Sequence, residues 1–307
     1  MGGTAIYMYL KMAVSTSCVI ILTLLLPYSM SKDLHGDGIS IQIYDGIDAK
    51  TGQFPFIGSL RGIYDLHMCG ATLISNDTAV TAAHCFELGS NEDADNLPSL
   101  AVFGDLELWR TSPTHHHSTF TAVTHEQYDQ VIIKNDIALI YLKSPIFDKY
   151  EKSISSIPIA NSSNEISDYS SCFVIGWGAT GDYQLSNVLQ YAPLELYENF
   201  VCGEIFGYHV IDETKLCAGS QTSDACPGDS GGPLACYRND DPSVMELVGV
   251  VSFGIPECQA GVPGVYTRVS TFRDWIESRP DPNRASVPYI TIYFVLVMAY
   301  ISIYSYI

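Results

Sequence analysis

Three short segments hold the residues of this chain that are best suited to nucleophilic chemistry. They are TAAHC at residues 81–85, NDIAL at 135–139 and CPGDSGGP at 226–233. The serine hydroxyl of Ser230 is a poor nucleophile unless a base takes its proton, and His84 with an orienting carboxylate at Asp136 would provide that base. Each segment alone is weak evidence, but the three together, in the order His, Asp, Ser, favour a serine hydrolase.

Short, β-rich apolar runs must position these segments. Examples lie at 79–83, 137–142 and 247–253, and Gly, Asn, Asp and Pro turns separate them. This pattern predicts an all-β sandwich or barrel rather than alternating βα units. The one clear helical stretch is late, at 270–277.

The composition excludes several classes of protein. Of 307 residues, 47% are hydrophobic and 16% are charged, which is too apolar for a disordered chain. The formal net charge is −19, and such a surface repels nucleic acid, so we expect no nucleic-acid partner. Nine cysteines indicate an oxidising compartment.

Both ends of the chain differ from the region between them. Residues 1–31 hold an apolar core followed by the small residues Ser29 and Ser31, which predicts a signal peptide, with a retained N-terminal anchor as the alternative. Residues 280–286 form a polar linker, and the uncharged tail at 287–307 is long enough to span a bilayer core of roughly 30 Å. The tail predicts a GPI signal or a transmembrane anchor, and free secretion is the third possibility.

Further motifs lie in the same central region. They are GWG at 176–178, LCAG at 216–219, VSFG at 251–254 and PGVYTRV at 263–269. With the three segments above, they make residues 43–279 resemble the trypsin-like serine proteases of the chymotrypsin family. The resemblance implies an all-β peptidase domain made of two packed six-stranded antiparallel β-barrels, with the site in the cleft between them and a C-terminal α-helix.

The family pattern implies a role for each residue of the site. His84 would be the general base and then the acid that protonates the leaving amine, and Asp136 would hold its tautomer and stabilise its cation. The backbone N–H groups of Gly228 and Ser230 would form the oxyanion hole. We expect no cofactor and no metal, and we interpret the three histidines at 115–117 as a surface loop.

The resemblance also predicts the substrate class. Asp224 lies six residues before Ser230, at the family's pocket floor, where a buried carboxylate needs a cationic partner such as a guanidinium. Ala225, next to the floor, has no hydroxyl that would help a shorter lysine, so Arg should be preferred over Lys. The pocket would also contain Ser252, Gly254 and Gly264. The expected partners are protein or peptide substrates with Arg or Lys at the cleaved bond, and protein protease inhibitors.

The cysteines can be paired only through the resemblance. Loss of Cys18 with the signal peptide leaves eight cysteines, which allow 105 pairings. The family pattern selects Cys69–Cys85, Cys172–Cys236, Cys202–Cys217 and Cys226–Cys258.

The same pattern implies activation by cleavage. After a short propeptide at 32–42, the freed ammonium of Ile43 would enter a pocket and pair with Asp229, which orders the oxyanion hole. Gln42 stands where relatives usually carry a basic residue, so a trypsin-like activator would not cleave this bond.

Surface features complete the prediction. Asn76 and Asn161 begin glycosylation sequons, and the acidic stretch at 88–99 predicts a solvated loop that favours basic residues beyond the scissile bond. The sequence therefore predicts an extracellular serine endopeptidase, secreted or tethered to the outer cell surface. The alternative is a catalytically silent homologue that acts as a binding protein.

Overall fold

The structure, a computed structural model, describes seven stretches of the chain. These are residues 46–88, 97–109, 115–146, 153–179, 184–222, 225–255 and 261–283. Backbone contacts separate Met1–Ile39 from Ser40–Ile307, and every described residue belongs to the second unit. Outside the described residues lie the predicted signal peptide and propeptide, Ile43, most of the acidic loop, Asp224, Cys258 and the hydrophobic tail.

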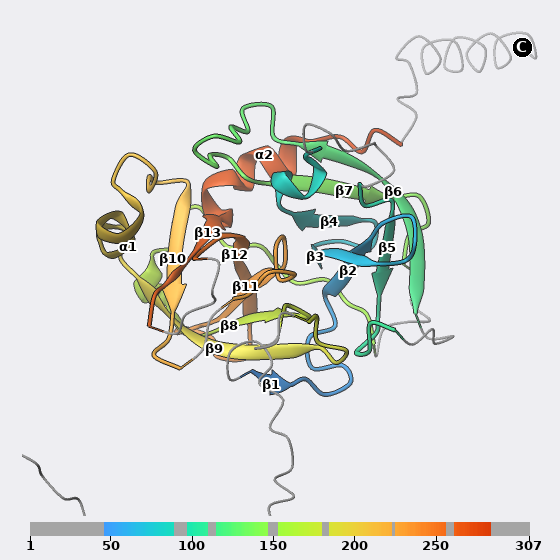
Figure 1. The fold of residues 1–307 in the computed structure, drawn as a ribbon, viewed down its shortest axis with the longest axis horizontal. Helices are drawn as coiled ribbons and strands as arrows, with labels where there is room; N and C mark the ends of the chain where they lie inside the picture. The colour runs from blue at the N-terminus through green and yellow to red at the C-terminus, as the bar shows by residue number, and fades with distance from the viewer. Residues whose placement is uncertain are drawn as a thin grey trace, which may run out of the picture. The chain divides into compact units, whose positions relative to one another are not determined.

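The first half of the domain is a closed antiparallel barrel (Figure 1). Its strands, in spatial order, are β2 (Ile57–Arg61), β3 (His67–Leu73), β4 (Thr78–Thr81), β7 (Ala138–Leu142), β6 (His116–Thr124) and β5 (Leu100–Phe103). Pairing of β5 with β2 closes the barrel. Close packing inside it requires a glycine at 58, because a Cβ there would lie 2.4 Å from the Phe103 ring.

The second half is also a six-stranded antiparallel barrel. Its strands, in spatial order, are β8 (Tyr169–Gly176), β9 (Gln190–Tyr197), β10 (Lys215–Gly219), β13 (Gly264–Arg268), β12 (Met245–Phe253) and β11 (Pro233–Arg238). The pairing of β8 with β9 closes the barrel, and the short β1 (Ile47–Asp48) extends it on β9. The predicted fold class is therefore confirmed.

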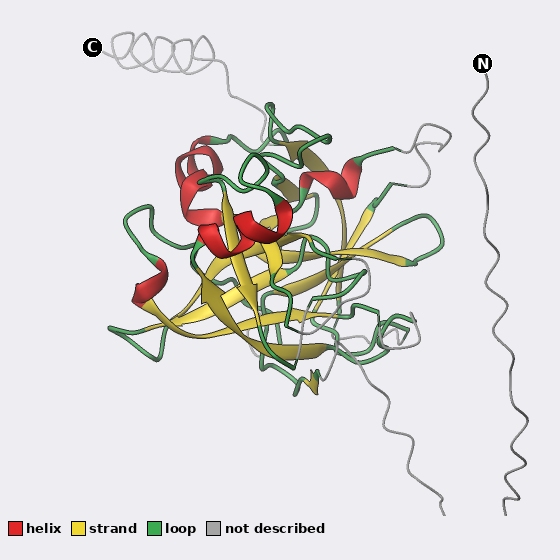
Figure 2. Cartoon of the chain, turned by 60° about the vertical axis from the view of Figure 1, so that its left-hand side comes forward, coloured by secondary structure: helices red, strands yellow, loops and turns green. Residues whose placement is uncertain are grey.

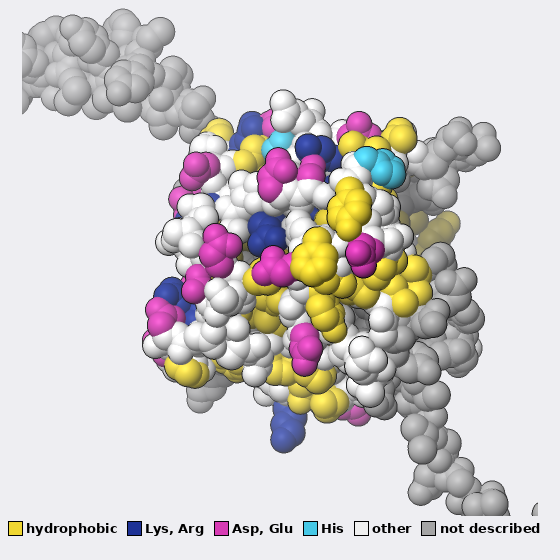
Figure 3. Space-filling model, turned by 90° about the vertical axis from the view of Figure 1, so that its left-hand side faces the viewer, with side chains coloured by type: hydrophobic (Ala, Val, Ile, Leu, Met, Phe, Trp, Pro, Cys, Tyr) yellow, Lys and Arg dark blue, Asp and Glu magenta, His cyan; other side chains and the backbone are white. Residues whose placement is uncertain are grey.

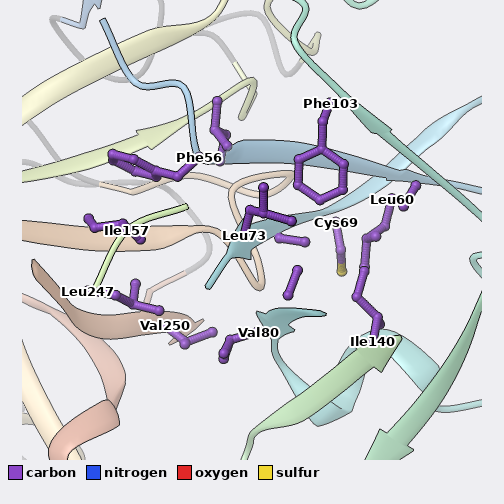
Figure 4. Packing of buried hydrophobic residues seen from close by; sticks show 14 of the residues in the cluster. Phe56, Leu60, Cys69, Leu73, Val80, Phe103, Ile140, Ile157, Leu247 and Val250 are labelled. Atoms are coloured by element: carbon purple, nitrogen blue, oxygen red, sulfur yellow. The ribbon is translucent and has the colours of Figure 1, made fainter. Parts of the chain in front are cut away.

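One core joins the two barrels (Figure 4). Leu73 and Val80 of the first barrel and Leu247 and Val250 of the second belong to one cluster of buried apolar side chains, together with Ile157 from the connecting segment. Each such side chain stabilises the fold by ~1.5–3 kcal/mol when it is removed from water. The barrels are thus fixed against each other, and this fixes the residues that both contribute to the site.

Helices lie on the outside of the strands (Figure 2). The predicted C-terminal helix is present as a 3₁₀ turn at Val269–Phe272 followed by α2 (Arg273–Ser278). The sequence did not predict α1 (Asn199–Phe206), because this helix is short, contains Gly203 and has no side-chain cap. A disulfide from Cys202 holds it to β10.

The face that carries α1 is apolar and acidic (Figure 3). Phe200 and Ile205 of α1 are both exposed, at 61% and 48%. Acidic side chains surround the apolar ones on this face, and basic side chains are fewer, in line with the negative net charge.

Three disulfides lie within the described residues. They are Cys69–Cys85, Cys172–Cys236 and Cys202–Cys217, the pairs that the family pattern selected. Cys226 is buried, and its predicted partner Cys258 lies outside the described residues. Asn76 and Asn161, the predicted glycosylation sites, are both exposed.

The interpretation of residues 115–117 as a surface loop is wrong. Strand β6 begins at His116, which pairs with Phe103 of β5, and both His115 and His116 are buried. Only His117 is exposed, as the alternation of a strand requires. Nε2 of His115 lies 2.9 Å from the Asp105 carboxylate, and Nε2 of His116 lies 2.7 Å from the Ser144 carbonyl.

Candidate active site

His84 and Asp136 are brought together by the first barrel. His84 lies in a 3₁₀ turn (Ala83–Phe86) directly after β4, and the Cys69–Cys85 disulfide ties this turn to β3. Nδ1 of His84 lies 2.8 Å from Oδ2 of Asp136, and the His84 backbone N–H donates to Oδ1 at 2.9 Å. Two bonds from one residue fix the orientation of the imidazole.

The second barrel completes the surroundings of Asp136. Ser252 of β12 donates its hydroxyl to Oδ2 of Asp136 at 2.5 Å, and Thr267 of β13 donates to the Asp136 backbone carbonyl at 2.6 Å. Asp136 itself is 1% exposed. The carboxylate therefore depends on hydrogen-bond donors from both barrels.

These contacts shift both pKa values in the direction that an ion pair requires. Burial favours neutral His84, but the hydrogen bond to Asp136 and its charge outweigh burial and raise the pKa of His84 above its ordinary value. Burial also opposes ionisation of Asp136, yet the bonds from His84 and Ser252 lower its pKa. Asp136 is an anion at neutral pH, beside an imidazole with increased affinity for a proton.

Ser230 lies in a turn that packs directly against the segment leading to His84. The Ser230 carbonyl accepts from the backbone N–H of Gly70, and the N–H of Gly231 donates to the Val251 carbonyl at 2.9 Å. Gly231 has a φ of 75°, and a Cβ there would lie 3.2 Å from the backbone nitrogen of Ala82. Only a glycine allows the serine turn to approach the His84 segment this closely.

A backbone hydrogen bond fixes the peptide group that precedes Gly228, one of the two predicted oxyanion-hole residues. Gly228 has a φ of 100°, and the preceding carbonyl, that of Pro227, accepts from the Ala179 N–H at 2.6 Å. No described peptide bond is cis, and in a trans peptide the N–H points opposite to the carbonyl. The Gly228 N–H is therefore directed away from Ala179.

His67, which the sequence did not single out, holds the other side of this turn. Its Nε2 lies 2.8 Å from the Gly228 carbonyl, and its Nδ1 lies 2.8 Å from the Ser59 hydroxyl. Its ring also packs edge-on against Trp177. Gly228 accepts at its carbonyl, so the imidazole donates from Nε2 and accepts from Ser59 at Nδ1. Residues 67 and 228 are far apart in sequence, and no local motif signals the contact.

Asp229 is a buried carboxylate held by backbone donors. The N–H groups of Gly178 and Cys226 donate to its two oxygens at 2.8 and 2.9 Å. A Cβ at Gly176 or Gly178 would collide with the carboxylate, so these glycines make its pocket. Burial raises the pKa of Asp229 to about 6, and no cation pairs with it within the part of the chain that the structure describes.

A cavity of about 260 Å³ opens beside Ser230. The predicted pocket residues Ser252, Gly254 and Gly264 all line it. A Cβ at Gly254 would lie 3.8 Å from the Gly264 Cα, so the two glycines lie next to each other in the cavity wall. Asp224, the predicted floor, lies outside the described residues, and Ala225, which follows it, lines the cavity.

One cluster of possible metal ligands lies in the described stretches, at Cys69, His84 and Cys85. The two sulfurs form a disulfide and His84 is bonded to Asp136, so these atoms do not form a metal site. The geometry instead places a histidine–carboxylate pair, a serine turn and a cavity together.

Comparison with known proteins agrees with this geometry. The family model for trypsin matches residues 43–276. The chain belongs to the trypsin family of serine proteases. The matched region of this trypsin-family protein contains all three of the predicted catalytic segments.

Its relatives include proteases with longer chains. The protein is 34% identical to mouse transmembrane protease serine 11G over 78% of this chain and 55% of the relative. It is 35% identical to mouse transmembrane protease serine 11C over 78% of this chain and 53% of the relative. It is 36% identical to mouse transmembrane protease serine 7, over 76% of this chain and 28% of the relative.

The trypsin-family chain thus spans about half the length of the first two of these relatives. Among the helices in the described stretches, none has the length and apolar character needed to span a membrane.

Proposed function

We propose that this protein is a serine endopeptidase that hydrolyses peptide bonds after Arg, and after Lys second, through an acyl-enzyme. Nε2 of His84 takes the hydroxyl proton of Ser230 as its oxygen attacks the scissile carbonyl carbon. The N–H groups of Gly228 and Ser230 donate to the oxyanion that forms. His84 then gives the proton to the leaving amine as the C–N bond breaks, which leaves the acyl group on Ser230. A water molecule that gives its proton to His84 attacks the acyl carbon, the bond to Ser230 breaks, and His84 returns the proton to the Ser230 oxygen.

The contact between His84 and Asp136 carries this proposal. Asp136 is ionised and can only accept, so Nδ1 of His84 is the donor in the 2.8 Å bond. In the neutral imidazole, Nε2 is then the acceptor, which is the tautomer that a general base for Ser230 needs. Ser252 links this pair to the cavity, because it bonds Asp136 and also lines the cavity beside Ser230.

The specificity for Arg follows from the cavity and from Asp224. Gly254 and Gly264 have no side chains, so the sides of the cavity stay open to a long substrate side chain. Ala225 adds no hydroxyl that would help a shorter lysine. A carboxylate at the floor would pair with the guanidinium through two hydrogen bonds.

Activation would follow cleavage between Gln42 and Ile43. The buried Asp229 carboxylate, with its raised pKa and two backbone donors, is suited to receive the freed Ile43 ammonium. Such a pair would hold the turn that contains Gly228 and Ser230. An unpaired buried charge is costly, so the turn would be less ordered before cleavage.

A fluorophosphonate probe tests the catalytic proposal. The full chain is expressed with residues 38–42 replaced by an enteropeptidase recognition sequence, so that cleavage frees Ile43. We expect labelling of the cleaved protein, no labelling of Ser230→Ala, and undiminished labelling of Ser243→Ala, which alters an exposed serine. A folded, correctly cleaved protein that is not labelled would instead be a binding homologue.

We also propose that the enzyme is held at the outer cell surface through residues 287–307, with the signal peptide directing export. Relatives named as transmembrane proteases support a surface location. Treatment of intact cells with phosphatidylinositol-specific phospholipase C distinguishes the anchors. Release indicates a GPI anchor, retention that is lost on truncation after Ser286 indicates a spanning tail, and free full-length protein in the medium contradicts both.

A further inference from the structure

Arg61 is a buried arginine that hydrogen bonds connect, through Ser59 and His67, to residues 226–231, which we call the oxyanion turn. It is 5% exposed, at the end of β2, and lies opposite His67 on the adjacent strand β3. Its Nε donates to the Ser59 hydroxyl at 3.1 Å, and its Nη1 donates to the Asp65 carboxylate at 3.1 Å. A buried guanidinium is costly unless its bonds are well made, and the catalytic steps above do not use it.

The donors and acceptors in this cluster form one directed chain. Arginine can only donate, so the Ser59 oxygen accepts from Arg61 and its single hydrogen is available for Nδ1 of His67. With Nδ1 occupied as an acceptor, the imidazole proton is on Nε2 and donates to the Gly228 carbonyl at 2.8 Å. The chain therefore runs Arg61, Ser59, His67, Gly228.

We propose that Arg61 is a positioning residue for the oxyanion turn and acts through Ser59 and His67. Gly228 has a φ of 100°, and a glycine has wide backbone freedom. The peptide groups before and after it therefore each need a hydrogen bond that fixes their orientation. Ala179 holds the peptide before it and His67 holds the peptide after it. Arg61 contributes by fixing the direction of the Ser59 hydroxyl, which selects the His67 tautomer that donates to Gly228.

The charges around His67 support this role. A second cation on its ring would face Arg61 in a buried site, and burial together with Arg61 lowers the pKa of His67 to about 4. Asp65 pairs with the outer side of Arg61, while Asp105, paired with His115, is close enough to interact with its charge. From the second barrel His67 meets the Trp177 ring and the Gly228 carbonyl. His67 is therefore neutral wherever His84 can act as a base.

A double-mutant cycle tests the inference, which rests on the proposed role of Gly228. The variants are Arg61→Met, Ser59→Ala and the double variant, with Asp65→Asn as a control that keeps the Arg61–Ser59 bond. Each is made in the full chain with the enteropeptidase site and cleaved. We measure kcat and KM on a peptide substrate and the inhibition constant of a peptide aldehyde, whose adduct places an oxyanion in the hole.

We expect Arg61→Met to lower kcat about tenfold with KM within about twofold, the loss expected for one charged hydrogen bond that positions the transition state. The aldehyde should bind more weakly by a similar factor. In the Ser59→Ala background, Arg61→Met should lower kcat by less than about twofold, since the chain of hydrogen bonds is already broken. Asp65→Asn should be close to wild type.

Two results would overturn the inference. One is an unchanged kcat in Arg61→Met, and the other is an equal loss with and without Ser59, which would mean that Arg61 acts by another route. If Arg61→Met does not fold, Ser59→Ala alone is measured, since it removes the link between Arg61 and His67, and an unchanged kcat and an unchanged aldehyde inhibition constant in Ser59→Ala would overturn the inference. Failure of the wild type to react with fluorophosphonate would contradict the proposed function itself and is seen before any variant is made.

Discussion

The Ser252 hydroxyl donates a 2.5 Å hydrogen bond to Oδ2 of Asp136, the same oxygen that lies 2.8 Å from Nδ1 of His84. The family pattern implied a place for Ser252 in the substrate pocket, and it does line the cavity beside Ser230. The strand that borders the cavity thus also stabilises the ionised form of Asp136. A single residue of the second barrel lines the cavity beside Ser230 and also contacts the carboxylate of the first barrel.

This contact predicts the effect of Ser252→Ala. Without the donor, the full charge of Asp136 acts on His84, so the pKa of His84 rises further. The acid limb of kcat/KM should move to higher pH by a few tenths of a unit, and the maximum should fall by less than about tenfold. The control is Thr267→Val, because Thr267 bonds only the backbone carbonyl of Asp136. If the acid limb of kcat/KM moved equally in both variants, the shift would not come from the hydrogen bond between Ser252 and Asp136.

In the wild-type enzyme, the acid limb should lie above pH 6.5, the ordinary pKa of histidine, because Asp136 raises the pKa of His84. The neutral imidazole is the active base, so activity is present above this pKa and is lost as the pH falls through it. Asp136→Asn removes the attracting charge. It should move the limb to lower pH and reduce kcat by about 10³–10⁴-fold. A pH profile with the same acid limb in both proteins would show that another group controls it.

The predicted catalytic residues are recognisable in the sequence because their chemistry demands particular residue types in short motifs. His84, Asp136 and Ser230 each lie in such a motif, and the glycines around Ser230 are needed where the backbone has a φ that L-residues avoid. The all-β fold follows from the short apolar runs and turns, and the resemblance supplied the two barrels.

The supporting residues could not be predicted in the same way. His67 bonds to Gly228, which is 161 positions away in the sequence. Arg61 lies next to His67 only because β2 pairs with β3 in the barrel. His115 and His116 were misplaced because polar residue types conceal the alternation of a strand. The roles of these residues depend on contacts between segments that are distant in the sequence, and no local motif in a single sequence indicates such contacts.

Asp224→Ser tests the predicted specificity. Removing the carboxylate should lower kcat/KM for Arg substrates by about 10³-fold or more, because the guanidinium would be buried without a partner. Substrates with uncharged residues at the cleaved bond should change little. Profiling of a peptide library measures both effects. A variant that keeps its Arg preference, or a wild type that prefers Phe or Leu, contradicts the prediction.

Gly228→Ala should disrupt the oxyanion hole. The residue has a φ of 100°, and an added Cβ would lie 2.5 Å from Cδ2 of Leu185, so the turn must change conformation. Losing one oxyanion donor lowers kcat by about 10²–10³-fold. Gly52→Ala is the matched control, since Gly52 also has a positive φ, 75°, but is exposed at the surface. Both variants should melt at lower temperature, and only Gly228→Ala should lose kcat.

The activation proposal makes its own prediction for Asp229→Asn. The neutral amide cannot pair with the freed Ile43 ammonium, so cleaved Asp229→Asn should show less than about 1% of wild-type fluorophosphonate labelling. Asp240→Asn, which changes an exposed carboxylate, should be labelled normally.

The freed ammonium of Ile43 should also give the pH profile of the wild type an alkaline limb. An α-amino group ordinarily titrates near pH 8, and pairing with Asp229 raises its pKa, so activity is present below this pKa and is lost as the pH rises through it. Kinetics between pH 7 and pH 11 should therefore place this limb above pH 8. If cleaved Asp229→Asn is labelled as fast as the wild type, the carboxylate has no part in activation, and the buried pocket at Gly176 and Gly178 serves only the fold.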